Sequence, residues 1–317
     1  MKTAAVTGGS GFVGRHLVAR LVSQGWQVRL LSRGEAGERR ANIEHFRGDL
    51  TRDDGVPPEF LDGVDVLFNC AGEIRDESRM MALHVEGTDR LISAARGRPL
   101  HWIQLSSVGA YGPRASGIVL DDDVDRPVGV YEATKASADL RLEQAIRESE
   151  LRHVSILRPS IIFGDDMPNA SLAQWVEAIR RGRFIFIGPV GAIANYVHVE
   201  SVVDALLCSA WEVERRSASR RYIVSEHLPM EEFVETVCVA LRRPTPRMRI
   251  PLGLARRVSR MGVSIARRFP LTPSRVEALS TRVIYASDRA RQELRWFPGI
   301  PLTQGLAAYV AGRWRHG

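Results

Sequence analysis

The first half of the chain alternates between short apolar runs and longer stretches with helical periodicity. The apolar runs, which predict buried β-strands, cover residues 4–7, 28–32, 43–46, 64–69, 102–106 and 154–157. The spacing of apolar positions predicts helices at residues 14–23, 80–96 and 132–148. Strands that alternate with helices in this way favour an α/β fold with a doubly wound parallel sheet, whose two faces are covered by helices.

The pattern becomes irregular after residue 164. Helices are predicted at residues 172–181, 202–211 and 231–241, and short strands at residues 196–199 and 222–225, while prolines interrupt residues 242–251. We therefore expect a sheet domain over residues 1–165 and a smaller, mixed α/β region over residues 166–317 that is interleaved with it. Right-handed crossovers bring the carboxyl ends of parallel strands to one edge, and the second region is expected to cover that edge.

Composition narrows the class of protein. The 317 residues include 44% hydrophobic and 26% charged side chains, which is ordinary for a globular protein. No apolar run reaches the length of about 18 residues that a membrane-spanning helix needs, so no membrane span is expected. The three cysteines, Cys70, Cys208 and Cys238, are scattered without metal-ligand spacing. They indicate reduced residues of a cytoplasmic protein and no metal site.

The formal net charge of +7 raises the question of an anionic partner. The arginines are spread along the chain, and no nucleic-acid motif accompanies them, so we interpret most of the charge as solvated surface and expect no nucleic-acid partner. Residues 251–271 are the local exception, because five arginines lie there among apolar residues. We expect an amphipathic helix on the domain surface, with a helix resting on a membrane as the alternative.

Three evenly spaced glycines, Gly8, Gly11 and Gly14, connect the first predicted strand to the first predicted helix. Glycine permits a tight turn and a close approach of the backbone to a pyrophosphate. The N-terminus of the helix offers free N–H groups and a dipole that stabilise phosphates. Strand, glycine turn and helix in this order predict a dinucleotide site in a Rossmann-type fold.

Lys135 is distinctive because Lys2 is the only other lysine among 44 lysines and arginines. It follows Tyr131 by four residues, so the phenol and the ammonium would lie on one face of a helix. A neighbouring ammonium lowers the pKa of a phenol from its usual value of about 10. The pair therefore predicts a general acid/base that works near neutral pH.

Ser107 directly follows the predicted strand at residues 102–106. A hydroxyl at the carboxyl end of a strand can hold a ligand oxygen near the Tyr131 phenol. The alternative is a serine that caps a turn. The presence of Tyr131 and Lys135 favours the first interpretation.

Together these motifs resemble the extended short-chain dehydrogenase/reductase family, also called the NAD(P)-dependent epimerase/dehydratase family. Each motif is weak alone, but their combination in family order over residues 1–205 is highly specific. The motifs are Thr7-Gly8-x-x-Gly11-x-x-Gly14, Gly48-Asp49-Leu50, Asn69-Cys70-Ala71-Gly72, Ser106-Ser107 with Tyr111-Gly112, Tyr131-x-x-x-Lys135, Leu157-Arg158-Pro159, Phe163-Gly164 and Tyr196-Val197-His198-Val199.

The resemblance implies the roles of the site residues. Ser107 would hydrogen-bond the reacting oxygen, and Tyr131 would donate or accept its proton while a hydride moves to or from a nicotinamide. Lys135 would bind the nicotinamide ribose and lower the pKa of Tyr131. The cofactor would also contact Gly8, Gly11, Phe12, Val13, Gly14, Asp49, Leu50, Ala71, Gly72, Pro159 and Ile162.

The end of the second predicted strand bears on the choice of cofactor. An acid there would hydrogen-bond the adenosine ribose and favour NAD. This chain has Ser32 and Arg33 instead, so a 2′-phosphate meets no repulsion and has a charged partner. Arg39 and Arg40 are candidate helpers. We therefore expect NADP to be preferred, with NAD as the alternative.

Three positions complicate the resemblance. His84 stands where the family usually has asparagine, and it either packs a helix or tunes a proton relay. Asn195 stands where many members that act on sugar nucleotides place an arginine for the diphosphate. Asn169 lies near the position where those members contact the nucleotide, but it can also cap the next helix.

The leading functional hypothesis is hydride transfer at a secondary alcohol or ketone of a nucleotide-activated sugar, by a 4-keto reductase or a 4-epimerase. The alternative is a 3-beta-hydroxysteroid or dihydroflavonol type of enzyme that acts on a hydrophobic alcohol. A protein that binds NADP(H) without turnover is the third hypothesis, and the complete set of Ser107, Tyr131 and Lys135 argues against it. The expected partners are a small-molecule substrate and, through the resemblance, a second copy in a homodimer.

Overall fold

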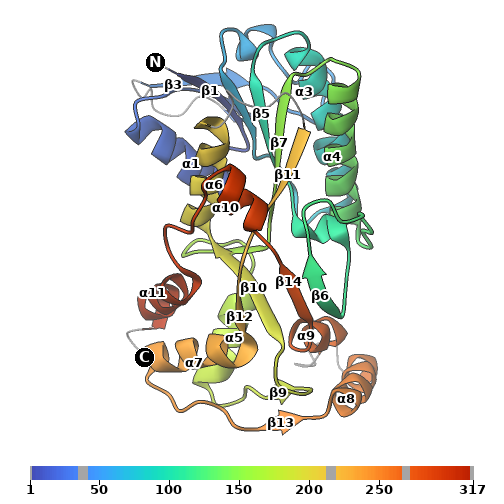
Figure 1. Ribbon diagram of the computed structural model, residues 1–317, viewed down its shortest axis with the longest axis vertical. Coiled ribbons are helices and arrows are strands. Elements are labelled where there is room, and N and C mark those ends of the chain that lie inside the picture. The colour runs from blue at the N-terminus through green and yellow to red at the C-terminus, as the bar shows by residue number, and fades with distance from the viewer. Residues whose placement is uncertain (1, 35–41, 212–218, 266–271, 315–317) are drawn as a thin grey trace.

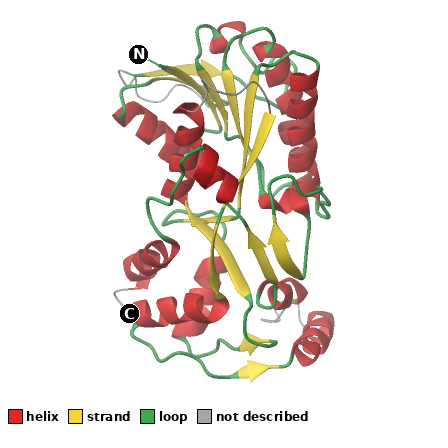
Figure 2. Cartoon of the chain, viewed as in Figure 1, coloured by secondary structure: helices red, strands yellow, loops and turns green. Residues whose placement is uncertain are grey.

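The computed structural model describes residues 2–34, 42–211, 219–265 and 272–314. A large parallel sheet lies at one end of an elongated molecule, and a smaller mixed region lies at the other (Figures 1 and 2). The strand order of the large sheet is β11-β7-β5-β4-β1-β2-β3, and every pairing in it is parallel. Its strands are β1 (Thr3–Thr7), β2 (Gln27–Ser32), β3 (Ile43–Arg47), β4 (Val66–Asn69), β5 (His101–Leu105), β7 (His153–Pro159) and β11 (Ser219–Val224). The predicted Rossmann-type α/β fold is confirmed.

The order of the strands reverses between β1 and β4, because the chain adds β2 and β3 on one side and β4, β5 and β7 on the other. Such a reversal leaves a crevice at the carboxyl ends of the strands, where open α/β sheets bind ligands. The glycine turn after β1 lies at this point.

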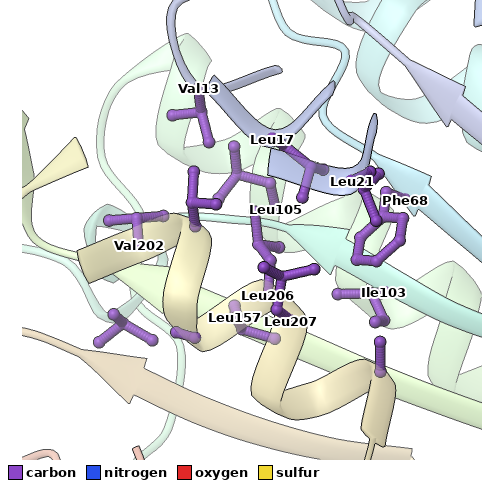
Figure 3. Packing of buried hydrophobic residues seen from close by; sticks show 14 of the residues in the cluster. Val13, Leu17, Leu21, Phe68, Ile103, Leu105, Leu157, Val202, Leu206 and Leu207 are labelled. Carbon is purple, nitrogen blue, oxygen red and sulfur yellow. The ribbon is translucent and has the colours of Figure 1, made fainter. Parts of the chain in front are cut away.

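Helices cover both faces of the sheet. On one face, α1 (Phe12–Ser23) and α6 (Val199–Trp211) pack against each other over the strands. Figure 3 shows Leu17 of α1 and Leu206 of α6 converging on Phe68 of β4 and Ile103 of β5. On the other face, α3 (Gly87–Ala95) and α4 (Val130–Arg147) pack together. Burial of these apolar side chains is the main stabilising force of the sheet domain.

The smaller region contains a three-stranded sheet of β12 (Glu226–Pro229), β10 (Ile193–His198) and β8 (Ile161–Phe163). Two further strand pairs, β13 (Arg249–Ile250) with β9 (Phe186–Ile187) and β14 (Arg282–Tyr285) with β6 (Ser116–Val119), border it. Its helices are α5 (Ser171–Arg180), α7 (Met230–Leu241), α8 (Leu252–Ile265), α9 (Pro273–Ala278) and α11 (Leu302–Trp314), and α10 (Asp288–Glu293) leads back beside β11. A separate hydrophobic core, which includes the buried residues Phe233 and Tyr309, holds this region together.

Three sequence expectations need correction. The helix predicted at residues 80–96 is divided into α2 (Glu77–Met80), the π-helical turn η2 (Met81–Glu86) and α3. The strand predicted at residues 196–199 ends at residue 198, because Val199 begins α6. Residues 242–251 are not entirely irregular, since they contain β13.

The arginine-rich segment at residues 251–271 begins as helix α8, which packs against α9 and buries Ala255 and Ser259. Arg256 of α8 forms an ion pair with Glu277 of α9, 3.0 Å apart. Arg267 and Arg268 lie outside the described residues. Within the described parts of the chain, no helix combines the length and the apolar character needed to cross a membrane.

Candidate active site

The turn between β1 and α1 depends on glycine at two positions. Gly8 has a φ of +67°, and a Cβ atom there would lie 2.6 Å from the backbone of Cys70 and Ala71. A Cβ atom on Gly14 would lie 2.1 Å from the carbonyl oxygen of Gly8. The missing side chains therefore let β1, the loop after β4 and the first turn of α1 approach closely.

This close approach forms a backbone cradle that fits a pyrophosphate. Gly11 is the residue before the first turn of α1, and its N–H donates to the Gly8 carbonyl over 2.9 Å. The N–H groups at the start of α1, which include those of Phe12 and Val13, are available to an anion together with the helix dipole. Phe12 packs next to Gly164, since a Cβ atom on Gly164 would lie 3.3 Å from the Phe12 ring.

Asp49 and Leu50 follow β3 at the same edge of the sheet, and Leu50 is buried. Burial opposes the ionisation of Asp49, but hydrogen bonds from the N–H and the hydroxyl of Thr51 and the charges of Arg33 and Arg79 lower the pKa of its carboxyl below the usual range. Asp49 is therefore an anionic acceptor close to the end of β2.

Ser32 is the last residue of β2, and the exposed Arg33 follows it. The Ser32 hydroxyl donates to the carbonyl of Gly34 over 3.4 Å, so the chain turns away from the sheet here. Arg39 and Arg40, the candidate helpers, lie outside the described residues.

Buried side chains tie the ends of three neighbouring strands together. The Thr7 hydroxyl donates to Asn69 Oδ1 over 2.5 Å, and Asn69 Nδ2 donates to Gln104 Oε1 over 3.0 Å. These bonds fix the end of β4, from which Ala71 and Gly72 continue. A Cβ atom built on Gly72 would lie 3.8 Å from Lys135 Nζ, so the structure brings this loop next to the predicted lysine.

Lys135 lies in α4 and is buried. Its ammonium donates to the carbonyl oxygen of Leu105, the last residue of β5, over 2.6 Å. Burial lowers the pKa of Lys135, and the negative charge of Asp139, one turn further along α4, opposes this effect. Among the described residues the ammonium has this one hydrogen-bond acceptor, which holds it at the strand ends and leaves two of its three donors for other partners.

Ser107 and Tyr131 meet beside this lysine. Ser107 precedes the short helix η3 (Val108–Tyr111), and its Oγ accepts a hydrogen bond from the Gly109 N–H over 3.1 Å. It also hydrogen-bonds to the phenol of Tyr131, in the first turn of α4. The structure thus brings together Ser107, Tyr131 and Lys135, three residues that the sequence analysis selected.

The expectation that Lys135 lowers the pKa of Tyr131 is wrong for the protein without a bound ligand. Burial raises the pKa of the phenol to about 12, the charge of Glu132 adds to this effect, and the hydrogen bond with Ser107 opposes it. The ammonium points to the Leu105 carbonyl instead. Tyr131 is therefore protonated at neutral pH.

His84 connects the loop after β4 to α4. Its Nε2 accepts from the Glu73 N–H over 2.9 Å, and its Nδ1 bonds to the Thr134 hydroxyl over 2.8 Å. Its ring lies edge-on to Tyr131, with the ring centroids 5.7 Å apart. Burial and the charge of Lys135 lower the pKa of His84 to about 3, so the ring is neutral. His84 lies in the π turn η2, a kind of irregularity that is frequent at functional sites.

The sequence analysis missed a buried ion cluster that holds α4 against the sheet. Arg158 of β7 donates to Asp139 through Nε over 3.0 Å and to Asp125 through Nη1 over 2.6 Å. The Ser106 hydroxyl also donates to Asp139 over 2.7 Å. Asp139 follows Lys135 by four residues, and this spacing is the signal that could have identified it.

The predicted nicotinamide contacts Pro159 and Ile162 lie at the boundary between the two parts of the molecule. Pro159 ends β7, and Ile162 is the middle residue of β8. Ile162 packs against the hydrophobic cluster of the sheet domain. Pro159 is thus the last residue of the strand that lies next to β5, and Ile162 comes three residues later, so both approach the same edge as Ser107.

A cavity of about 440 Å³, the first cavity, begins beside Val108 and Ser160, the chain neighbours of Ser107 and Pro159. Its other described lining residues come from the smaller region: Ile161, Ser171, Trp175, Ile193, Ala194, Asn195, Tyr196, Met230, Thr272, Arg275, Ala278, Thr281 and Tyr285. Most of these contribute carbon atoms, so the first cavity offers an apolar surface with a few polar groups.

Two asparagines singled out in the sequence have local partners. Asn195 lines the first cavity, but its Nδ2 donates to the Val283 carbonyl over 2.8 Å and thereby links β10 to β14. Asn169 Oδ1 accepts from the Ser171 N–H over 2.8 Å at the start of α5. Asn169 is absent from the described residues that line the first cavity.

Comparison with known proteins agrees with this geometry. The model of the NAD dependent epimerase/dehydratase family matches residues 4–225. A 4-hydroxy-2-methyl-3-oxo-4-farnesyl-3,4-dihydroquinoline-1-oxide ketoreductase of Stigmatella aurantiaca is 28% identical over 321 residues, 96% of this chain and 94% of the relative. A 3beta-hydroxysteroid-dehydrogenase/decarboxylase of Arabidopsis thaliana, isoform 1, is 29% identical over 345 residues, 95% of this chain and 77% of the relative.

Among solved structures, the UDP-glucose 4-epimerase of Thermotoga maritima, determined with UDP-glucose, is similar to this chain with a TM-score of 0.72 and 19% identity. The match covers 97% of each chain. At this level of identity the comparison shows the shared fold alone.

Proposed function

Because the chain belongs to the NAD dependent epimerase/dehydratase family, the extended short-chain dehydrogenases/reductases, we propose that it reduces ketones on hydrophobic skeletons or, in reverse, oxidises the matching secondary alcohols. The observation that carries this proposal is the apolar first cavity, which begins at Val108, the residue after Ser107. The names of the two relatives, which include a farnesyl-substituted ketone and a hydroxysteroid, support it.

The residues of the site fit a nicotinamide coenzyme. The glycine turn and the start of α1 would hold its pyrophosphate, and Lys135, beside Gly72, would hold the ribose next to the nicotinamide. The bound reduced coenzyme supplies a hydride to the carbonyl carbon.

The protein's own groups handle the proton. Ser107 donates a hydrogen bond to the carbonyl oxygen and Tyr131 donates its phenolic proton to that oxygen as negative charge develops there. A phenol whose pKa is raised to about 12 is fully protonated at neutral pH, which suits a proton donor in reduction. The phenolate that remains then takes a proton from solvent and returns to the phenol.

NADP is our proposal for the preferred coenzyme. The end of β2 presents Ser32 and the exposed Arg33 and no acid, so a 2′-phosphate finds a charge-assisted partner there. The family description leaves this preference open.

A nucleotide-activated sugar, the leading hypothesis from the sequence, remains the second candidate. Arg275 lines the first cavity and is a cation that could contact a diphosphate. Asn195 argues against a nucleotide-sugar substrate. It occupies the position where many sugar-nucleotide members of the family place an arginine, and its side-chain amide donates to the backbone of β14 instead.

A substrate panel tests the proposal. Reduction would be followed through NADPH absorbance with a 3-ketosteroid, a long-chain 2-alkanone and a UDP-4-keto-hexose. We expect kcat/KM for one of the hydrophobic ketones to exceed that for the nucleotide sugar at least about tenfold, a difference of about 1.4 kcal/mol in transition-state binding. Preferential turnover of the nucleotide sugar would overturn the proposal.

A further inference from the structure

A second cavity, of about 700 Å³, lies in the smaller region farther from the strand ends. Its described lining comes from α5, from the segment that leads into β9, and from β13, α9 and the end of α11. These elements all lie at the end of the molecule opposite the large sheet (Figure 1).

The two cavities share two wall residues, Trp175 of α5 and Arg275 of α9. The Trp175 ring is held edge-on against Phe233, with the ring centroids 6.2 Å apart. Arg275 donates to the side chain of Gln174, the residue before Trp175. The two cavities are therefore neighbours that meet at these two side chains.

The inner wall of the second cavity is hydrocarbon. Phe184 and Ile187 are buried around β9, and Leu279 is buried after α9. The charged groups lie at its rim, where Arg181 and Arg183 are exposed and the Glu177 carboxylate is paired with Arg181 over 2.6 Å. A polar ligand would lose its hydration inside this wall without gaining hydrogen-bond partners, whereas a hydrocarbon chain loses nothing.

We propose that the second cavity binds a long acyclic hydrocarbon tail of the substrate while the ketone of that substrate lies in the first cavity. The proposal rests on the proposed function, because it needs the reacting carbonyl beside Ser107 and Tyr131. It narrows the substrate class to ketones that carry a long alkyl or isoprenoid chain.

A series of 2-alkanones of about six to sixteen carbons tests the proposal. Each methylene that enters an apolar cavity improves binding about fourfold, so kcat/KM should rise by about that factor per carbon until the second cavity is filled. Compact ketones of equal carbon number, such as polycyclic ones, should not show this increase.

Two matched variants separate the cavities. Ala178 lines only the second cavity and Ala278 only the first. We expect Ala178→Phe to reduce kcat/KM at least about tenfold for the longest ketones and less than about twofold for the shortest, because filling the second cavity displaces several methylenes. Ala278→Phe should impair short and long ketones alike. Retained turnover of short ketones shows that the Ala178→Phe protein is folded.

A binding measurement distinguishes failure of this inference from failure of the proposed function. Trp314 lines the second cavity, so a 2-alkanone with bromine at its far end should quench tryptophan fluorescence, and Trp314→Phe should reduce the quenched fraction. If ketones are reduced at rates that do not depend on chain length and Ala178→Phe changes nothing, the tail site is refuted and the proposed function stands. If the brominated ketone quenches but no ketone is reduced, the proposed function is refuted.

Discussion

The phenol of Tyr131 is subject to opposing influences. Burial raises its pKa to about 12, and the hydrogen bond with Ser107 lowers it. Lys135 is next to Gly72 and bonded to the end of β5, so its charge lies where a ribose would lie. In the proposed mechanism the lysine therefore positions the coenzyme, and the phenol keeps its proton until the substrate oxygen takes it.

Replacing Tyr131 by phenylalanine removes the proton donor and leaves the glycine turn intact. We expect kcat of Tyr131→Phe to fall by about 10² to 10⁴, the usual contribution of a general acid. The affinity for NADPH, measured by fluorescence titration, should change less than about threefold. Tyr285→Phe is the matched control, because Tyr285 lines the first cavity without contributing the proton in this mechanism. Full activity of Tyr131→Phe would contradict the assigned role.

Arg33 is the residue on which we base the coenzyme preference. Loss of a charge-assisted hydrogen bond costs about 1.5–3 kcal/mol, so Arg33→Ala should reduce the ratio of kcat/KM for NADPH over NADH by about tenfold to a hundredfold. Arg52, an exposed arginine of the loop after β3 that pairs with Asp54, offers a control. If the NADPH/NADH ratio of kcat/KM is unchanged in Arg33→Ala, or changes equally in Arg52→Ala, then Arg33 does not bind the 2′-phosphate.

At the scale of elements, the catalytic groups owe their positions to a few tight contacts between strands, loops and α4. The Thr7–Asn69–Gln104 chain aligns the ends of β1, β4 and β5, and Arg158 fixes α4 through Asp139. His84 completes the arrangement by joining the loop after β4 to α4.

Gly14→Ala tests the tight turn before α1. The new Cβ atom would lie 2.1 Å from the Gly8 carbonyl oxygen, so strand and helix must separate. We expect the free energy of unfolding to fall by about 1–3 kcal/mol, as for other overpacked sites, together with a loss of NADPH affinity. Chemical denaturation and a coenzyme titration measure the two effects.

Gly312→Ala is the control for that substitution. Gly312 lies in α11, where an added Cβ atom meets nothing within 4 Å. It should raise the free energy of unfolding by up to about 1 kcal/mol, because alanine is the better helix former. Similar destabilisation by both substitutions would refute the steric argument.

The sequence predicted most elements because their patterns are local. Periodicity located α1, α4 and all strands of the large sheet within a few residues, and the glycine spacing located the turn. It did not predict the π turn around His84, because the apolar pattern over residues 80–96 is also compatible with one continuous helix. It also placed Tyr131 and Lys135 on one face without showing that the Leu105 carbonyl would bind the ammonium, because that bond joins distant parts of the chain.

At the scale of the whole molecule, two buried histidines make stability depend on pH. Burial lowers the pKa of both His84 and His101 to about 3. The unfolded chain binds these protons near pH 6.5, so between about pH 6.5 and 3 it holds more protons than the folded chain and the free energy of unfolding falls as pH falls. Each histidine should account for about 2 kcal/mol of loss between pH 7.5 and pH 5.

Denaturation at pH 7.5 and pH 5 checks this expectation. His101 bonds to Ser155 over 2.9 Å inside the sheet domain, and glutamine can replace that bond without titrating. We expect His101→Gln to lose less stability than the natural protein when the pH is lowered, by about 2 kcal/mol. Equal losses in both proteins would show that His101 is not a source of the pH dependence.

The arrangement of the elements in space was harder to predict from the sequence than the elements themselves. A short apolar run at residues 222–225 predicts a strand but does not identify its sheet. The sequence pattern of a buried strand is the same whichever strand it pairs with. Only the pairing in space shows that β11 lies beside β7 and that α6 covers the same sheet. The two cavities likewise arise from side chains of elements that are distant in sequence.

The position of β11 has a consequence for biosynthesis. Until residues 219–224 have left the ribosome, β7 of the nascent chain is an edge strand whose outer N–H and C=O groups are unpaired. Exposed edge strands of this kind can pair with strands of other molecules and lead to aggregation. This side of the sheet is therefore closed only after the segment that contains β11 has been synthesised.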